Sequence, residues 1–95
     1  MTKIEVQYFL GCPNSEKMIE NVKSAITGLK VNYTETLVEN LEIAAKIKFR
    51  GSPTLLINGR DYEDLPEPKY ASLSCRHYIH GLPTSDEIKN KIKGS

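Results

Sequence analysis

The sequence predicts an α/β domain in which seven elements follow one another in the order β-α-β-α-β-β-α. Three observations indicate this order: an alternating apolar run at 3–10, a helical apolar stripe at 13–29, and an Asn58-Gly59 turn between two short β-prone segments. Two strands joined through a helix form a parallel pair with a right-handed crossover, whereas a hairpin adds an antiparallel pair. We therefore expect a mixed four-stranded sheet with helices on both faces.

The first strand and the first helix meet at Cys12. Apolar and polar residues alternate over 4–10, and Phe9 breaks this alternation, so we expect the end of the strand to be buried on both faces. Pro13 suits the first turn of a helix, where its missing N–H has no partner to lose. Apolar residues then recur three and four positions apart over 18–29, which predicts an amphipathic helix.

The second half of the chain contains shorter elements. Residues 31–38 are β-prone, 39–48 have a less regular helical pattern, and 53–57 form a short apolar strand before the hairpin turn. Residues 63–82 are irregular, with a helical turn expected around 73–79, and a capping-box pattern starts a final helix at 84–92.

Length and charge restrict the possible functions. Ninety-five residues predict one domain spanning 1–95, and the net charge of +1 predicts neither a nucleic-acid surface nor an anchor to anionic lipids. No apolar run reaches the ~20 residues of a membrane span. The first strand pattern begins at Lys3 without a signal-peptide core, so we expect a cytoplasmic protein. In that compartment, two cysteines favour catalysis, redox sensing or metal binding over a static disulfide.

Cys12 is the first candidate functional residue. A thiol at a helix N-terminus lies near unpaired N–H groups and the positive end of the helix dipole, which stabilise the nucleophilic thiolate. The alternative is a buried cysteine that packs as a small apolar residue. Ser15 lies one turn further along, where its hydroxyl would donate to the thiolate or cap the helix, or serve as an ordinary first-turn serine.

The chain resembles the thioredoxin-like superfamily in its element order, in Cys12 at the first strand-to-helix junction, and in Ser52-Pro53-Thr54 before the third strand. It is more specifically similar to small bacterial and archaeal thioredoxin family proteins of the alkylmercury-lyase-like group, which share a Cys-Pro-x-Ser motif. The strings that carry this similarity lie at residues 9–14, 51–61, 75–78 and 81–84.

The resemblance implies a thiol-disulfide oxidoreductase-like protein that acts on protein or small-molecule thiols and disulfides without a bound cofactor. It also implies that Pro53 is a cis-proline, and that Pro13, Ser52, Pro53 and Thr54 contact the substrate. Because position 15 is serine, a thioredoxin-type disulfide within the motif cannot form.

Cys75 is the candidate partner for Cys12. In the expected sheet, the first strand ends, the third begins and the fourth ends at one edge, so residues 63–82 leave the sheet beside Cys12. Long irregular segments in small domains are often functional. Cys75 is therefore a candidate resolving thiol, and a buried or merely exposed thiol is the alternative.

The sequence is also compatible with other functions. Cys12 and Cys75 with His77 or His80 would suit a soft metal such as zinc, copper(I) or mercury, but the spacing matches no strong zinc pattern and no metal ligand is assigned. A non-catalytic binding domain is a further alternative. Arg60 and Arg76 could add positive charge near Cys12, although surface positions are expected for both. The sequence does not determine the oligomeric state.

Overall fold

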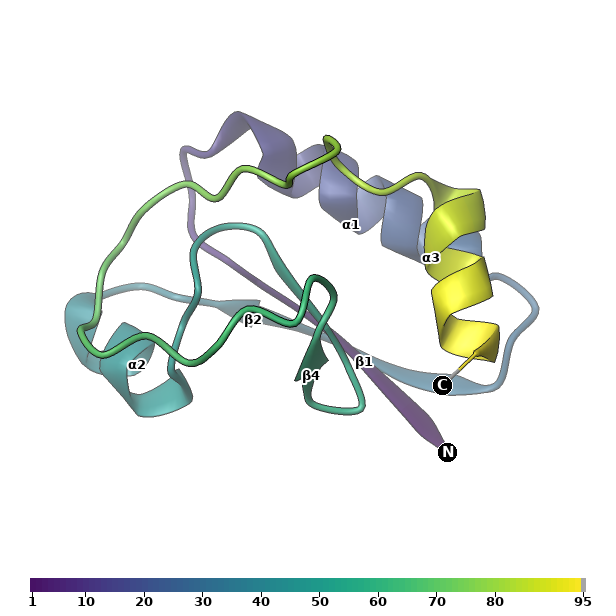
Figure 1. Ribbon diagram of the computed structural model, residues 1–95, viewed down its shortest axis with the longest axis horizontal. Coiled ribbons are helices and arrows are strands. Elements are labelled where there is room, and N and C mark those ends of the chain that lie inside the picture. Colours follow the sequence, from purple (N-terminus) through teal and green to yellow (C-terminus); the bar gives the residue numbers. More distant parts are fainter. Residues whose placement is uncertain (95) are drawn as a thin grey trace.

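A mixed four-stranded sheet in the order β2-β1-β3-β4 forms the centre of the protein (Figure 1). The structure is a computed structural model, which describes residues 1–94. Strand β1 (Thr2–Tyr8) pairs in parallel with β2 (Val31–Leu37) and antiparallel with β3 (Thr54–Ile57), and β3 pairs with the short β4 (Arg60–Asp61). The predicted mixed sheet and the predicted order of elements are thus confirmed.

Helices α1 (Pro13–Ile26) and α3 (Ser85–Lys93) pack against each other and against the sheet (Figure 1). Helix α3 begins with the predicted capping box, in which the hydroxyl of Thr84 accepts from the amide of Glu87 and the carboxylate of Glu87 accepts from the amide of Thr84. The main core lies between these two helices and the sheet. Its buried members are Ile4, Val6, Met18, Val22, Ala25, Leu55, Ile57, Tyr78, Ile88 and Ile92.

Helix α2 (Leu41–Ile47) lies away from α1 and α3, beyond the end of β2 (Figure 1). It starts two residues later than expected because Asn40 is its N-cap and accepts a hydrogen bond from the amide of Ile43. Its Ala44 belongs to a second apolar cluster with Val38 and Phe49.

The end of the first strand differs from the prediction. Strand β1 stops at Tyr8, Phe9 packs edge-on against Phe49 in the second cluster, and Leu10 is 77% exposed. The expected burial on both faces is therefore wrong for Leu10, because the chain has already left the sheet and the strand alternation no longer applies there.

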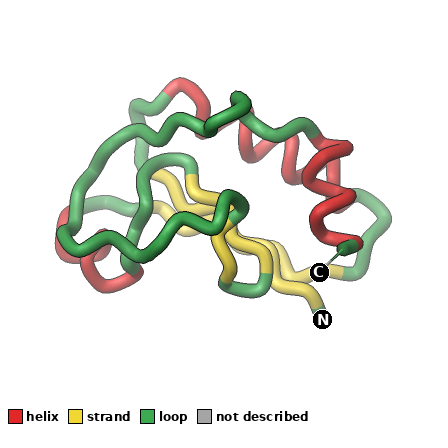
Figure 2. Tube along the Cα trace, in the orientation of Figure 1, coloured by secondary structure: helices red, strands yellow, loops and turns green. Residues whose placement is uncertain are grey.

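A long segment without helices connects β4 to α3 (Figure 2). The expected helical turn at 73–79 is wrong: this stretch is extended and forms an isolated bridge between Cys75 and Ser52. The carbonyl of Ser74 and the amide of Arg76 bond to Ser52, just before β3, so tertiary contacts replace local helical bonds there.

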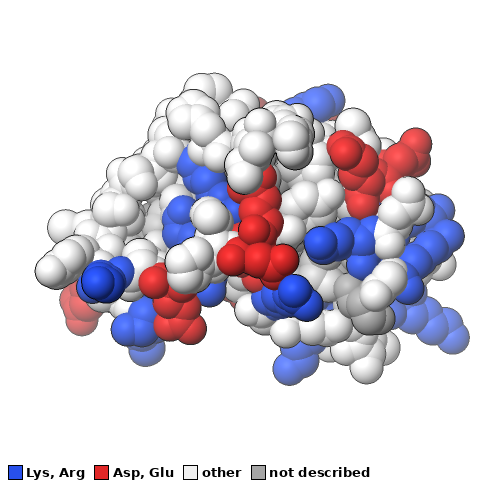
Figure 3. Space-filling view, viewed as in Figure 1, with Lys and Arg blue, Asp and Glu red and all other residues white. Residues whose placement is uncertain are grey.

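Charged side chains of both signs are interspersed on the face shown in Figure 3. This distribution agrees with the net charge of +1. Within residues 1–94, no helix has the length and apolar character needed to cross a membrane.

Candidate functional site

Cys12 and Cys75 form a disulfide across 63 residues of sequence, with their Cα atoms 5.7 Å apart. Cys12 is the N-cap residue of α1, where its sulfur lies at the positive end of a 14-residue helix. Cys12 is 6% exposed, whereas Cys75 is an exposed residue of the segment between β4 and α3. The structure thus brings together the two cysteines that the sequence indicated as a candidate redox pair.

Ser52 binds the backbone on both sides of Cys75. Its amide donates to the carbonyl of Ser74 (2.9 Å), and its carbonyl accepts from the amide of Arg76 (2.8 Å). These two bonds make residues 74–76 a short extra strand, parallel to the chain at Ser52. The pairing holds the backbone at Cys75 through hydrogen bonds that do not involve sulfur.

The Ser52 side chain links this strand edge to α1 and to the end of β1. Its hydroxyl shares a buried hydrogen bond with the Ser15 hydroxyl (2.7 Å) and accepts from the amide of Phe9 (3.1 Å). Ser15 was expected to donate to the thiolate or to cap the helix, and its catalytic role stays a prediction. In this structure the Ser15 hydroxyl holds the start of α1 against Ser52.

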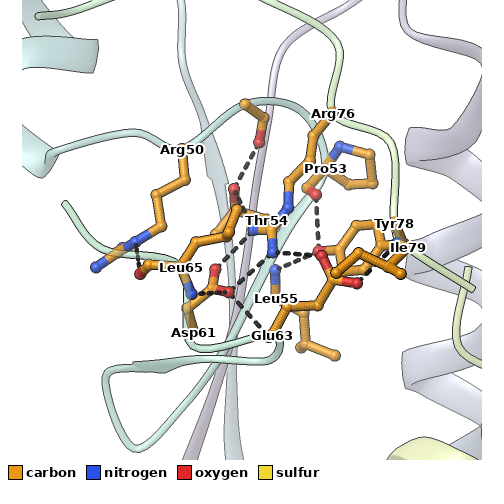
Figure 4. A network of polar contacts seen from close by, with 11 residues as sticks. Arg50, Pro53, Thr54, Leu55, Asp61, Glu63, Leu65, Arg76, Tyr78 and Ile79 are labelled. Atoms are coloured by element: carbon orange, nitrogen blue, oxygen red, sulfur yellow. Dashed lines mark hydrogen bonds and ion pairs between the residues drawn. The ribbon is translucent and has the colours of Figure 1, made fainter. Parts of the chain in front are cut away.

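The Ser52–Pro53 peptide bond is cis, and Tyr78 packs directly against this region (Figure 4). The Tyr78 hydroxyl donates to the carbonyl of Pro53 (2.9 Å) and accepts from the amide of Leu55 (3.2 Å). Burial raises the pKa of Tyr78, so its hydroxyl keeps the proton that the bond to Pro53 requires. Tyr78 therefore fixes the backbone at the beginning of β3.

Arg76 lies in a buried network of charges (Figure 4). Its guanidinium donates to both carboxylate oxygens of Asp61 (2.6 and 2.8 Å) and to Glu63 (3.2 Å), and it stacks 4.3 Å from the centre of the Tyr78 ring. The expected surface position is wrong for Arg76, whose side chain is only 4% exposed, because two carboxylates offset its charge there. The expectation holds for Arg60, which is exposed.

The shifts in pKa within the network favour the charged forms of Asp61 and Arg76. Burial alone would raise the pKa of Asp61, but the bidentate Arg76 and the amides of Leu65 and Glu63 outweigh burial and lower it. Burial would likewise lower the pKa of Arg76, and its carboxylate partners raise it instead. Asp61 and Glu63 thus hold Arg76, the residue that follows Cys75, through charged hydrogen bonds.

Gly51 permits the close contact between the two chain segments. It adopts φ +108°, and a Cβ atom built there would lie 2.9 Å from the Cβ of Arg76. Any larger residue would therefore push the Cys75 segment away from the edge of β3.

A groove with a volume of about 490 Å³ lies beside Cys12, formed by the end of β1, the residues that follow it and the first turns of α1. Cys12 and the exposed Pro13 lie in its wall, together with Ile19. Neither Cys75 nor Ser52 lines this groove. Cys12 therefore borders both this open groove, which Cys75 does not line, and Cys75 itself, to which its sulfur is bonded.

The predicted substrate-contact residues do not all line this groove. Pro13 is exposed at the groove, whereas Ser52, Pro53 and Thr54 are buried and bond to the protein's own chain. The Thr54 hydroxyl, for example, is 3.4 Å from a guanidinium nitrogen of Arg76. Substrate contact by these four residues stays a prediction.

The structure does not assemble the suggested metal ligands. Cys75 is bonded to Cys12, and His77 and His80 are both exposed. Within residues 1–94, no group of three His, Cys, Asp or Glu side chains is placed to hold a metal ion.

Sequence reasoning missed the network of Asp61, Glu63, Arg76 and Tyr78. Asp61 and Glu63 stand two residues apart after the hairpin, the spacing that puts side chains on one face of an extended chain. That spacing could have indicated a shared partner, but the sequence does not identify the arginine that fills the role.

Comparison with known proteins supports the fold. The family model for the thioredoxin domain matches residues 2–62, which is more than half of the chain and includes Cys12, Ser15 and Pro53. The match ends before Cys75 and the segment that carries it. The search of curated proteins finds no match.

Proposed function

The chain belongs to the thioredoxin domain family, and from this premise we propose that it exchanges thiols and disulfides through Cys12 and Cys75. The observation that carries the proposal is the disulfide between the N-cap of α1 and an exposed residue 63 positions away. Because Ser15 replaces the second motif cysteine, Cys75 takes the role of resolving thiol.

The reaction has two exchange steps. In the reduced protein, the Cys12 thiolate attacks one sulfur of a substrate disulfide, the substrate S–S bond breaks, and one substrate thiolate leaves. The Cys75 thiolate then attacks the sulfur of Cys12, which forms the Cys12–Cys75 bond and releases the second substrate thiolate. The protein pair loses two electrons and the substrate gains them.

The α1 N-terminus supports both steps. Its dipole and its free N–H groups stabilise the Cys12 thiolate, both as the attacking group and as the leaving group when an external thiol reduces the disulfide. Pairing of Ser52 with residues 74–76 keeps Cys75 near Cys12 for the second step. A cytoplasmic thiol pool would return the pair to its reduced form. The subfamily that we propose for the chain is the alkylmercury-lyase-like group, whose members share the Cys-Pro-x-Ser motif.

A redox titration tests this proposal. We expect Cys12 and Cys75 to interconvert between dithiol and disulfide across dithiothreitol buffers, as read by alkylation and mass spectrometry. Cys12→Ser should abolish reduction of a model disulfide, and Cys75→Ser should accumulate a mixed disulfide on Cys12.

The exposed Ser72 lies in the same segment as Cys75, so Ser72→Ala is the matched control and should leave the titration unchanged. Failure to form the Cys12–Cys75 bond under any oxidising condition would refute the proposal. Full activity of Cys12→Ser would also refute it, because the reaction would then not use Cys12. Absence of activity in the wild-type protein would favour a non-catalytic or soft-metal role, and metal addition under native mass spectrometry would detect the latter.

A further inference from the structure

We infer that the site acts on low-molecular-weight disulfides and thiols and excludes extended polypeptides, because residues 74–76 already fill the strand edge beside Cys12. This inference rests on the proposed thiol–disulfide exchange and names the substrate class of that reaction.

A polypeptide joined to Cys12 through sulfur has strict requirements. Its cysteine Cα must lie within roughly 4–7 Å of the Cys12 Cα, and its backbone needs hydrogen-bond partners, which strand addition normally supplies. Cys75 already occupies such a position, with a Cα distance of 5.7 Å. The amide and the carbonyl of Ser52, which would bind an added strand, bind Ser74 and Arg76.

The segment is held by contacts other than the disulfide. The Arg76 guanidinium bonds to Asp61 and Glu63, and the second carboxylate oxygen of Glu63 accepts from the amide of Ile79 (2.9 Å) (Figure 4). These groups are buried or nearly so, with side-chain exposures of 4% for Arg76, 1% for Asp61 and 14% for Glu63. Reduction of the disulfide breaks none of these bonds, so the segment should stay in place in the reduced protein.

A tethered strand competes strongly with one in solution. A segment that is joined to its binding site by a short linker has an effective concentration at that site in the millimolar range. A peptide at ~10 µM with equal intrinsic affinity would therefore occupy the Ser52 edge about a hundredfold less often than residues 74–76 do. The fixed anchor of Arg76 adds to this advantage.

Small disulfides do not need the strand edge. The groove beside Cys12, which neither Cys75 nor Ser52 lines, has a volume of about 490 Å³, within the range of small-molecule sites, and Cys12 and Pro13 lie in its wall. A small disulfide bound there meets the Cys12 thiolate, one of its sulfurs bonds to Cys12, and the other leaves as a thiolate. Attack by Cys75 on Cys12 then releases the remaining thiolate, and two equivalents of a monothiol re-reduce the protein pair.

The test compares two substrates with the full chain. Hydroxyethyl disulfide represents small substrates, and insulin represents extended polypeptides. With each substrate at ~10 µM, we expect the wild-type protein to reduce hydroxyethyl disulfide at least about a hundredfold faster than insulin, the ratio expected from the tethered competitor at that concentration. Arg76→Gln should raise the insulin rate relative to the hydroxyethyl disulfide rate at least about tenfold, because opening the strand edge admits polypeptides and gives small disulfides no new access. Arg60→Gln removes the same charge from the exposed pair with Asp64 and should change neither rate.

Amide hydrogen exchange provides a second measurement that does not depend on the variants folding. The amides of Ser52 and Arg76 should remain protected after reduction with dithiothreitol, because their hydrogen bonds do not involve sulfur. Comparable rates with insulin and hydroxyethyl disulfide would overturn the inference, as would loss of protection at both amides on reduction. If neither substrate is reduced although both amides stay protected, the proposed exchange itself fails, and the inferred substrate class fails with it.

Discussion

Loss of the Cys12–Cys75 bond should lower the free energy of unfolding by about 4 kcal/mol. The bond joins two residues that are 63 positions apart in the sequence and so closes a loop of about that length. In the chain-entropy model, a loop of this length restricts the unfolded chain by roughly 14 cal/mol/K, which is about 4 kcal/mol at room temperature. The native state should change little on reduction, since Ser52 and the Arg76 network continue to hold residues 74–76.

Urea unfolding of the oxidised protein, the reduced protein and Cys75→Ser measures this effect. We expect the two forms without the bond to have similar, lower midpoints and a higher m-value than the oxidised protein, because an unfolded chain without a cross-link exposes more surface. A Cys12→Ser, Cys75→Ser double variant should not respond to reductant. A difference below about 1 kcal/mol between oxidised and reduced protein would refute the loop-closure reasoning.

Three further predictions concern the contacts around Cys75. Gly51→Ala should lower the free energy of unfolding by about 2 kcal/mol, measured in urea, because it combines strain at φ +108° with a 2.9 Å contact to Arg76. Tyr78→Phe should cost about 2 kcal/mol in the same assay, because it leaves the buried carbonyl of Pro53 and a backbone amide without partners. The folded-state pKa of Asp61 lies below its unfolded value, so Asp61 contributes stability above about pH 4 that is lost as pH falls further, and Asp61→Asn should flatten acid unfolding there.

Each of these predictions has a matched control. Gly28→Ala also places alanine at positive φ, but no atom lies within 4 Å of the added Cβ, so its cost should be smaller than that of Gly51→Ala. Tyr70 is 85% exposed, and Tyr70→Phe should leave the midpoint unchanged. Asp64→Asn removes a carboxylate from an exposed ion pair and should alter acid unfolding little. Equal effects of a variant and its control would contradict the corresponding argument.

The sequence by itself determined the fold class and the position of Cys12. The signals for these elements are local: the spacing of apolar residues, the Asn58-Gly59 turn and the capping box at Thr84. Each specifies its element without reference to distant residues. The same order of elements led to the correct inference that the segment after β4 passes Cys12. The predicted order of strands was therefore sufficient to suggest that Cys12 pairs with Cys75.

Only the tertiary structure decided how Cys75 is held. Two contacts depend on segments that only the fold brings together. One is the pairing of Ser52 with residues 74–76, and the other is the burial of Arg76 between Asp61 and Glu63. A single sequence assigns arginine to the surface, since the cost of burying its charge is offset only where carboxylates converge. The stretch 73–79, where a helical turn was expected, pairs with Ser52 for the same reason: the partner of the Ser74 carbonyl and of the Arg76 amide is a residue distant in the sequence.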